Sequence, residues 1–154
     1  MLRISQKLEY ATRAVIELAA RESEGVLVSA REIAETQQIP LRFLEQQLGT
    51  LAKAGVIVSH RGAGGGCRLA KPAAETSMAE IADAIEGVFY PMFCLEPGDA
   101  TCFQDSRCGL QGMWNDVQLA VRSVFENTSV ADLASHRRRR NLPIFGTTDL
   151  LRAH

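Results

Sequence analysis

The sequence lacks any long apolar stretch. None of its runs approaches the roughly 18 apolar residues that a membrane-spanning helix needs. The opening residues, MLRISQKLEYA, also lack the apolar core of a secretory signal peptide. Hydrophobic residues make up 46% of the 154 residues and charged residues 23%, which is ordinary for a water-soluble domain with a packed core. We therefore expect a cytoplasmic protein that does not bind a membrane.

The motifs of the common small enzymes are absent as well. The four cysteines include no CxxC pair of the kind that thiol oxidoreductases carry at a helix start. The glycine-rich stretch at 62–66 is not followed by the Lys-Ser/Thr of a phosphate-binding loop. No histidine stands in a recognisable catalytic triad with a serine or cysteine. We therefore expect a protein that is not an enzyme.

Charge is distributed unevenly, although the net charge is only −1. Residues 1–72 carry ten lysines and arginines against seven acidic residues, whereas residues 73–135 carry two against ten. Residues 136–154 are basic again, with five against one. A basic first half followed by an acidic segment favours one face that binds nucleic acid and a body that does not contact it.

The first part of the chain predicts three helices, two of which form a helix-turn-helix. Apolar residues recur at helical spacing over 5–22. Ser29 and Glu32 form a capping box that opens a second helix. Pro40 fits the first turn of a third helix, which ends at Gly55. Two short helices joined by a tight turn are the helix-turn-helix layout, in which the second helix enters the major groove of DNA.

A β-hairpin and a further helix follow. Residues 56–58 are β-prone, residues 62–66 form a glycine-rich tip, and residues 67–69 are the returning strand. A helix-turn-helix followed at once by a basic hairpin is a winged helix. Another capping box opens a short helix over 77–87. Residues 1–87 are therefore the expected winged helix-turn-helix DNA-binding domain, and the fold class is mainly α with a small β wing.

Residues 88–108 break the helical pattern and contain three cysteines, Cys94, Cys102 and Cys108. A loop of about 20 residues inside a compact domain is usually functional. Thiolates are the soft ligands that iron–sulfur clusters prefer, and the Pro and Gly residues let this loop wrap around a compact object. A zinc ion normally takes four ligands, often in CxxC pairs, so it fits this wide spacing less well. Plain thiols or a redox-active disulfide would also account for the three cysteines.

Three cysteines leave the site in need of a fourth ligand. No histidine follows Cys108 at close range, because the next residues are GLQGMW. The candidates are a carboxylate from elsewhere, Cys67 or an exchangeable small molecule. An oxygen ligand would leave the cluster labile and reactive, which suits a sensor.

A long amphipathic helix follows the cysteines over 109–127. Its apolar residues form one continuous stripe: Leu110, Met113, Trp114, Val117, Val121, Val124 and Phe125. Because this stripe is too long for so small a core, we interpret 109–134 as a long dimerisation helix followed by a short helix. A plain core helix is the alternative. Residues 135–154, with the run HRRRR, are expected to form a mobile basic tail.

Together these strings resemble the Rrf2 family of bacterial transcription regulators. The resemblance covers about residues 1–134, and it rests on LEYATRAVIELA, SAREIAETQQIPLRFLEQQLGTLAKAGVIVSHRGAGGGCRLAKP, SMAEIADAIEG and the cysteine loop. It implies a homodimer that binds palindromic, double-stranded promoter DNA, with RNA polymerase as an indirect partner. It also implies an iron–sulfur cluster near the dimer interface. The cysteine spacing is most similar to the iron-responsive RirA branch, and the histidine typical of the IscR branch is absent.

The same resemblance implies a fourth ligand. In NsrR-like members an acidic residue in the first helix of the partner subunit completes the site, and Glu9 falls on that position. A solvated carboxylate is the alternative for Glu9. Three cysteines and one oxygen ligand favour a 4Fe–4S cluster, with 2Fe–2S as the alternative. Cys67 replaces the aromatic residue usual after the wing glycines, and we expect it to be a buried strand residue rather than a ligand.

The implied function is a DNA-binding transcription regulator that uses its cluster to sense iron, redox state or nitric oxide. A cluster-free winged-helix regulator, switched by cysteine oxidation or by a partner protein, is the alternative.

The third helix offers candidate base-reading residues on its polar face: Arg42, Glu45, Gln46 and Gln47. Glutamate accepts a hydrogen bond from cytosine N4, and glutamine pairs with adenine. The resemblance implies base contacts at Glu45 and Gln46, and insertion of Arg61 on the wing into the minor groove. Phosphate contacts, which position a protein without reading sequence, are expected from Arg31, Lys53, Arg68 and Lys71. Each of these side chains could instead be an ordinary surface residue.

Overall fold

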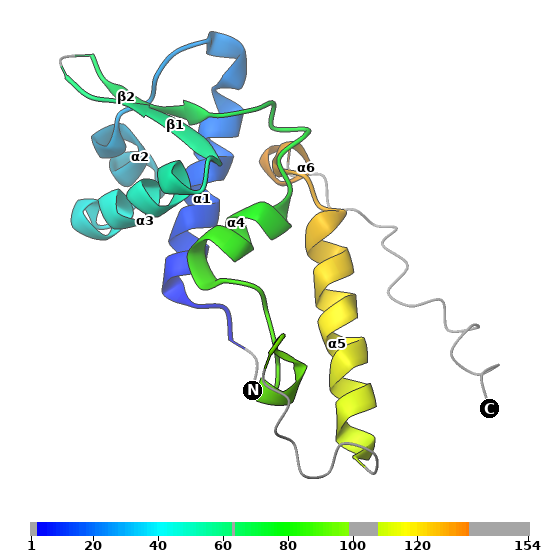
Figure 1. The fold of residues 1–154 in the computed structure, drawn as a ribbon. Helices are drawn as coiled ribbons and strands as arrows, with labels where there is room; N and C mark the ends of the chain where they lie inside the picture. The colour runs from blue at the N-terminus through cyan, green and yellow to red at the C-terminus, as the bar shows by residue number, and fades with distance from the viewer. Residues whose placement is uncertain (1–2, 63, 99–107, 136–154) are drawn as a thin grey trace.

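The computed structural model describes residues 3–62, 64–98 and 108–135. It contains two short 3-10 turns, η1 (Glu22–Glu24) and η2 (Phe93–Leu95), and two strands, β1 (Ile57–His60) and β2 (Gly66–Leu69). The helices are α1 (Gln6–Ala20), α2 (Ala30–Gln37), α3 (Leu41–Lys53), α4 (Met78–Glu86), α5 (Gly109–Glu126) and α6 (Val130–Ala134). The mainly helical fold with a small β wing is confirmed (Figure 1). Within these ranges, no helix combines the length and apolar character needed to cross a membrane.

Serine caps begin α1, α2 and α4. The Ser5 hydroxyl accepts a hydrogen bond from the Leu8 amide at the start of α1. Both predicted capping boxes are present, at Ser29 for α2 and at Ser77 for α4. Each cap satisfies amide groups that a helix start leaves without a partner. The first half of the fold is therefore fixed by local signals in the sequence.

The turn between α2 and α3 is tight. Gln38 ends α2 in the left-handed conformation, with φ of 53°. Pro40 lies at the N-cap of α3 rather than within its first turn, so the predicted placement of this proline is wrong by one position. Its carbonyl still accepts the first hydrogen bonds of α3, from Phe43 at 3.0 Å and Leu44 at 3.1 Å. This turn sets the angle between α2 and α3.

The wing is a two-stranded antiparallel sheet with an added bridge. Ile57 pairs with Leu69 at its base, and His60 pairs with Gly66 near its tip. Val28 and Cys67 exchange two backbone hydrogen bonds, of 2.9 Å and 2.8 Å, which attach the segment before α2 to β2. A Cβ at Gly66 would lie 2.7 Å from the Val28 carbonyl oxygen, so only glycine allows this close approach.

The core lies around α1. Its Ala11, Ala14 and Val15 are fully buried, as are Ile33 of α2 and Leu44 of α3. Small alanines on α1 let neighbouring helices approach closely, and the larger side chains fill the space between them. Residues of the wing and of α4 extend the same buried cluster. The winged-helix module therefore has one continuous core.

A buried carboxylate joins α1 to α2. Glu17 is 9% exposed and accepts hydrogen bonds from Arg21 at 3.0 Å and from the Gln37 amide at 2.8 Å. Arg21 also donates to Glu32 at 2.9 Å. The hydrogen bond from Arg21, together with the Ser29 amide, lowers the pKa of Glu32. These contacts satisfy the buried charge and fix α2 against α1.

The long helix α5 lies beside α4 and is less covered than the other helices (Figure 1). Arg122 of α5 donates to Asp83 of α4 at 2.5 Å. None of the 18 residues of α5, all of which are described, is buried. At its end, α6 docks on the core through the fully buried Val130, whose amide donates to the Thr76 carbonyl at 2.8 Å. α5 is thus attached along one side and at one end only.

Candidate nucleic-acid interface and metal centre

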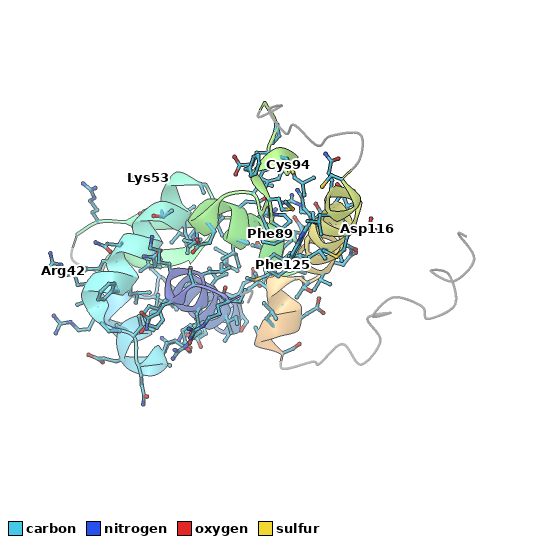
Figure 2. All side chains as sticks on the ribbon, turned by 90° about the horizontal axis from the view of Figure 1, so that it is seen from below. Arg42, Lys53, Phe89, Cys94, Asp116 and Phe125 are labelled. Carbon is cyan, nitrogen blue, oxygen red and sulfur yellow. The ribbon has the colours of Figure 1, made fainter. Side chains whose placement is uncertain are left out.

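One face of α3 is buried and the other is open to solvent. Leu44, Leu48 and Leu51 are 0–6% exposed and fix the helix against the core. Arg42, Glu45 and Gln46 are exposed on the other face. Figure 2 shows Arg42 and Lys53, at opposite ends of α3, pointing outward on the side of the molecule away from α5. This open face has the residue types that read base edges in a major groove.

Gln47 does not belong to that open face. Its side chain is only 7% exposed, and the expectation that it lies on the polar face of α3 is wrong. At 100° per residue, position 47 falls on the same side of the helix as Leu44 and Leu51. Gln47 is therefore part of the packing that supports α3, and it is not available to a base edge in this conformation.

Four exposed cations around α3 and the wing are available to bind phosphate. A fifth exposed cation, Arg68 of β2, donates only to the neighbouring Leu69 carbonyl at 3.3 Å. None of the five forms an ion pair with another described residue, and the other four are Arg31, Arg42, Lys53 and Arg61. Lys71, in contrast, lies 2.7 Å from Glu80. Burial alone would raise the pKa of Glu80, but the Lys71 ammonium and the Ser77 amide hold it below its ordinary value. Lys71 is thus already neutralised within the fold.

The structure places two of the three loop cysteines at one end of the molecule. Cys94 lies in η2, and Cys108 is the N-cap residue of α5. Both are half-buried free thiols. η2 lies against the first part of α5, and Figure 2 shows Cys94 close to that helix. Cys102 lies outside the described residues. Within 3–62, 64–98 and 108–135, no three metal-ligating side chains converge.

The start of α5 lies beside these cysteines. Cys108 stands at the N-cap position, and within the described residues its side chain forms no capping hydrogen bond. Peptide N–H groups in the first turn of a helix lack partners within the helix and favour a negative group nearby. Cysteine thiolates and the sulfides of an iron–sulfur cluster are such groups, and hydrogen bonds to sulfur tune a cluster. The donor set and the helix end therefore fit a thiolate-bound iron–sulfur cluster.

Cys67 lies elsewhere. It belongs to β2 and is 6% exposed, which confirms the expectation of a buried strand residue. Burial raises the pKa of its thiol and so disfavours the thiolate that a metal requires. In Figure 1 the wing and η2 lie at opposite ends of the molecule. The structure therefore gives Cys67 no access to a site at η2.

Glu9 lies in the first turn of α1, at the same end of the molecule as η2 and the start of α5 (Figure 1). Its side chain is 58% exposed and forms an ion pair with Arg13 at 3.5 Å. The Arg13 guanidinium also donates to the Gln37 carbonyl, at the end of α2. Glu9 is therefore accessible to a ligand or a second subunit. Arg13 contacts both Glu9 and the helix-turn-helix, and so connects the two.

The apolar stripe of α5 is divided between two environments. Trp114, Val121 and Phe125 are half-buried, and Phe125 packs against the core. Leu110 and Met113 are 56% and 48% exposed. At 100° per residue they lie about 120° and 180° around α5 from Arg122, which contacts α4. The interpretation of α5 as a plain core helix therefore accounts for the half-buried flank but not for the exposed one.

The chain was compared with known proteins. The model of the family described as Rrf2, iron-dependent transcriptional regulator, matches residues 4–136. The chain belongs to the Rrf2 family. A helix-turn-helix transcriptional regulator of Mycobacterium tuberculosis is 35% identical over 133 residues, which cover 86% of this chain and 81% of the relative. The relatives are regulators, which confirms that this Rrf2-family chain is not an enzyme.

Two solved structures of Rrf2 regulators are similar to this fold. The global cysteine regulator CymR of B. subtilis superposes with a TM-score of 0.74 at 31% identity, covering 88% of this chain and 98% of CymR. IscR of T. potens superposes with a TM-score of 0.70 at 28% identity, covering 88% of both chains. These structures support the winged-helix fold and the assignment to transcription regulators that bind DNA and typically act as dimers.

Sequence reasoning missed two residues that the structure makes prominent. Phe43 is a large aromatic residue left 57% exposed on α3, and the burial of Leu44 and Leu48 would have placed it on the open flank of the helix. Arg13 lies four residues after Glu9, so its ion pair is a local signal. Its contact with Gln37, in contrast, joins residues 24 positions apart and is seen only in the folded chain.

Proposed function

We propose that the protein is a homodimeric transcription regulator whose affinity for promoter DNA depends on an iron–sulfur cluster held by Cys94, Cys102 and Cys108. The observation that carries this proposal is the position of Cys94 in η2 beside α5, whose N-cap residue is Cys108. The description of the matching family as iron-dependent supports it. Three cysteine ligands and one oxygen ligand favour a 4Fe–4S cluster, and 2Fe–2S is the alternative.

A bound cluster would supply a centre that reacts with oxidants and nitric oxide and is lost when iron is scarce. The protein's own residues have separate tasks. Cys94 and Cys108 would hold the centre together with Cys102, and amides in the first turn of α5 would favour its negative charge. Glu9 of the partner subunit supplies the oxygen ligand. This last assignment is supported by the exposure of Glu9 and by its position at the cysteine end of α1.

The Arg13 guanidinium provides the contact between this site and the DNA-binding helices. It binds the Glu9 carboxylate and the Gln37 carbonyl at the end of α2, and α3 begins four residues after Gln37. When Glu9 gains or loses an iron ligand bond, the negative charge next to Arg13 changes. The hydrogen bond from Arg13 to the Gln37 carbonyl, which holds the helix-turn-helix against α1, then changes in strength. This is a coupling between two sites of the kind that allosteric regulators use.

The exposed flank of α5 is the proposed dimer seam. Apolar residues recur along it with spacings of three and four, the pattern of a two-helix seam: Leu110, Met113, Val117, Ala120 and Val124. A pair of such helices places two α3 helices in one particle. Two-fold symmetry then predicts palindromic half-sites, which dimers of this kind bind about one helical turn (34–36 Å) or a multiple of it apart.

The test is the iron and acid-labile sulfide content of the full chain purified without oxygen. Cys94→Ala and Cys108→Ala are expected to lose the cluster, whereas Cys67→Ala is the matched control and is expected to keep it. Glu9→Ala is expected to lower cluster content or make the cluster labile, with the exposed Glu24→Ala as its control. A colourless wild-type protein without iron and sulfide contradicts the proposal. Unchanged content in Glu9→Ala rejects Glu9 alone.

A second candidate is a cluster-free regulator that is switched through its thiols. It is favoured by the similarity to CymR, which has been solved in an oxidized form from Staphylococcus aureus, and by the half-buried free thiols of Cys94 and Cys108. For this candidate, iron is absent and oxidation changes DNA binding with formation of a disulfide. Mass analysis after thiol alkylation, with and without a mild oxidant, distinguishes the two.

A further inference from the structure

Phe43 is an apolar side chain on a surface that is otherwise polar. It lies in the first turn of α3, and its side chain is 57% exposed. Its neighbours on the open face are Arg42, which adjoins it, and Gln46, one turn along at i+3. Single exposed apolar residues are common and need no explanation by themselves. Phe43 lies on the helix that is the candidate for the major groove, so its exposed ring is available to contact DNA.

The DNA group that Phe43 would contact follows from what each base pair presents in the major groove. The N-terminal residues of a recognition helix lie closest to the base edges. A phenyl ring has no hydrogen-bond donor or acceptor, so it cannot read guanine, cytosine or adenine edges or bind a phosphate. The C5-methyl group of thymine is the one apolar group on a natural base edge. Among the base edges, Phe43 therefore matches only the thymine methyl group.

We propose that Phe43 is a specificity-determining residue that contacts the C5-methyl group of a thymine in each half-site. Gln46, beside it on α3, has the side chain that pairs with adenine in the groove. The two residues together would select an A·T-containing step, with Gln46 reading the adenine and Phe43 the methyl group. This inference rests on the proposed function, because it requires α3 to enter the major groove.

The experiment starts from duplexes that the full-length wild-type protein selects out of a randomised pool. Each thymine of a selected duplex is replaced in turn by deoxyuridine, which removes only the C5-methyl group. Affinities are then measured for the wild-type protein, Phe43→Ala and Phe43→Leu at one fixed salt concentration. Leu119→Ala is the matched control, since Leu119 is an equally exposed apolar residue, at 58%, on the far face of α5.

We expect deoxyuridine at one thymine per half-site to weaken wild-type binding about fourfold, the effect of removing one buried methyl group. Phe43→Ala is expected to bind the unmodified duplex more weakly and to be insensitive to that replacement. Phe43→Leu should retain part of the sensitivity, and Leu119→Ala all of it. Because Phe43 is exposed, these variants should unfold at the wild-type temperature, which thermal denaturation checks.

Three results would overturn the inference. In the first, wild-type protein tolerates deoxyuridine at every thymine, or selects half-sites that contain none. In the second, Phe43→Ala loses the same affinity on every duplex and keeps the deoxyuridine effect, which indicates a contact to sugar groups of the DNA backbone. In the third, no duplex is selected at all, and the proposed function then fails together with this inference. The first two results leave the proposed function intact.

Discussion

The winged-helix module and the region that follows it are stabilised in different ways. In the module, residues such as Ala14, Ile33 and Leu51 are fully buried, and most helices begin at a serine cap. In α5 no residue is buried, and Leu110 and Met113 are about half exposed. The module is therefore stable through its own core, whereas α5 has apolar surface that no other described residue covers.

Removing core volume should separate the two regions most clearly. Leu44→Ala is expected to lower the free energy of unfolding by about 2–5 kcal/mol, because Leu44 is fully buried in the module. Val124→Ala on α5 is expected to lower it by less than about 0.5 kcal/mol in dilute protein, since Val124 is 43% exposed. Urea denaturation measures both. Equal losses would show that α5 belongs to the same cooperative core.

A charge on the proposed seam should break dimers without unfolding the module. Met113→Glu is expected to raise the dimer dissociation constant at least about tenfold, since a carboxylate would have to be desolvated there. Leu119→Glu, about 120° around α5 from Met113 and outside the proposed seam, is the matched control and should leave it unchanged. Analytical ultracentrifugation over a range of concentrations gives both constants. A dimer that survives Met113→Glu and dissociates in Leu119→Glu would place the seam on the other face.

Two glycines of the module should respond in opposite ways to substitution by alanine. Gly49→Ala in α3 is expected to raise the free energy of unfolding by about 0.5–1 kcal/mol, because the new Cβ meets nothing within 4 Å and alanine favours helix. Gly66→Ala in the wing should lower it, because the Cβ would lie 2.7 Å from the Val28 carbonyl. Thermal denaturation measures both shifts. Stabilisation by Gly66→Ala would mean that the wing is not packed as described.

The smallest effect concerns acid. The pKa of Glu80 is lowered in the folded state, so its stabilising contribution is present above the unfolded pKa of about 4.3 and is lost as pH falls through the lower folded pKa. Glu80→Gln should therefore reduce stability at neutral pH by about 0.5 kcal/mol or less and flatten the decline in acid. Glu75→Gln, an exposed neighbour, is the control. Identical pH profiles for the two variants would contradict the role of the Lys71–Glu80 pair.

The sequence predicts the module well because its signals are local. Capping boxes at Ser29 and Ser77 act within four residues, and helical spacing of leucines identifies the buried face of α3. The prediction for Gln47 is wrong because this residue lies at the edge of the buried face. Its polar side chain favoured the open face in the prediction, although its helical position is on the buried side. The cap at Ser129 was missed, although Ser129 and Asp132 have the same spacing as the other boxes.

The sequence defines the candidate site only in part. The three cysteines and their spacing indicate a chemistry, and the helix predicted over 109–127 already puts Cys108 at its start. The sequence does not indicate which element lies beside Cys94. That placement depends on the docking of η2 on α5, a contact between residues distant in the chain. The link from Arg13 to Gln37 is of the same kind. Pairings of this sort have no periodic signal, so only the folded chain reveals them.

The most direct test of a cluster-controlled regulator compares two forms of one protein on one duplex. The affinity of the full chain for a selected operator is measured anaerobically, first loaded with iron and sulfide and then after the metal has been removed, at the same salt concentration. The account predicts that the two dissociation constants differ by at least about tenfold, the size of a typical allosteric coupling. Equal affinities of the two forms would contradict it.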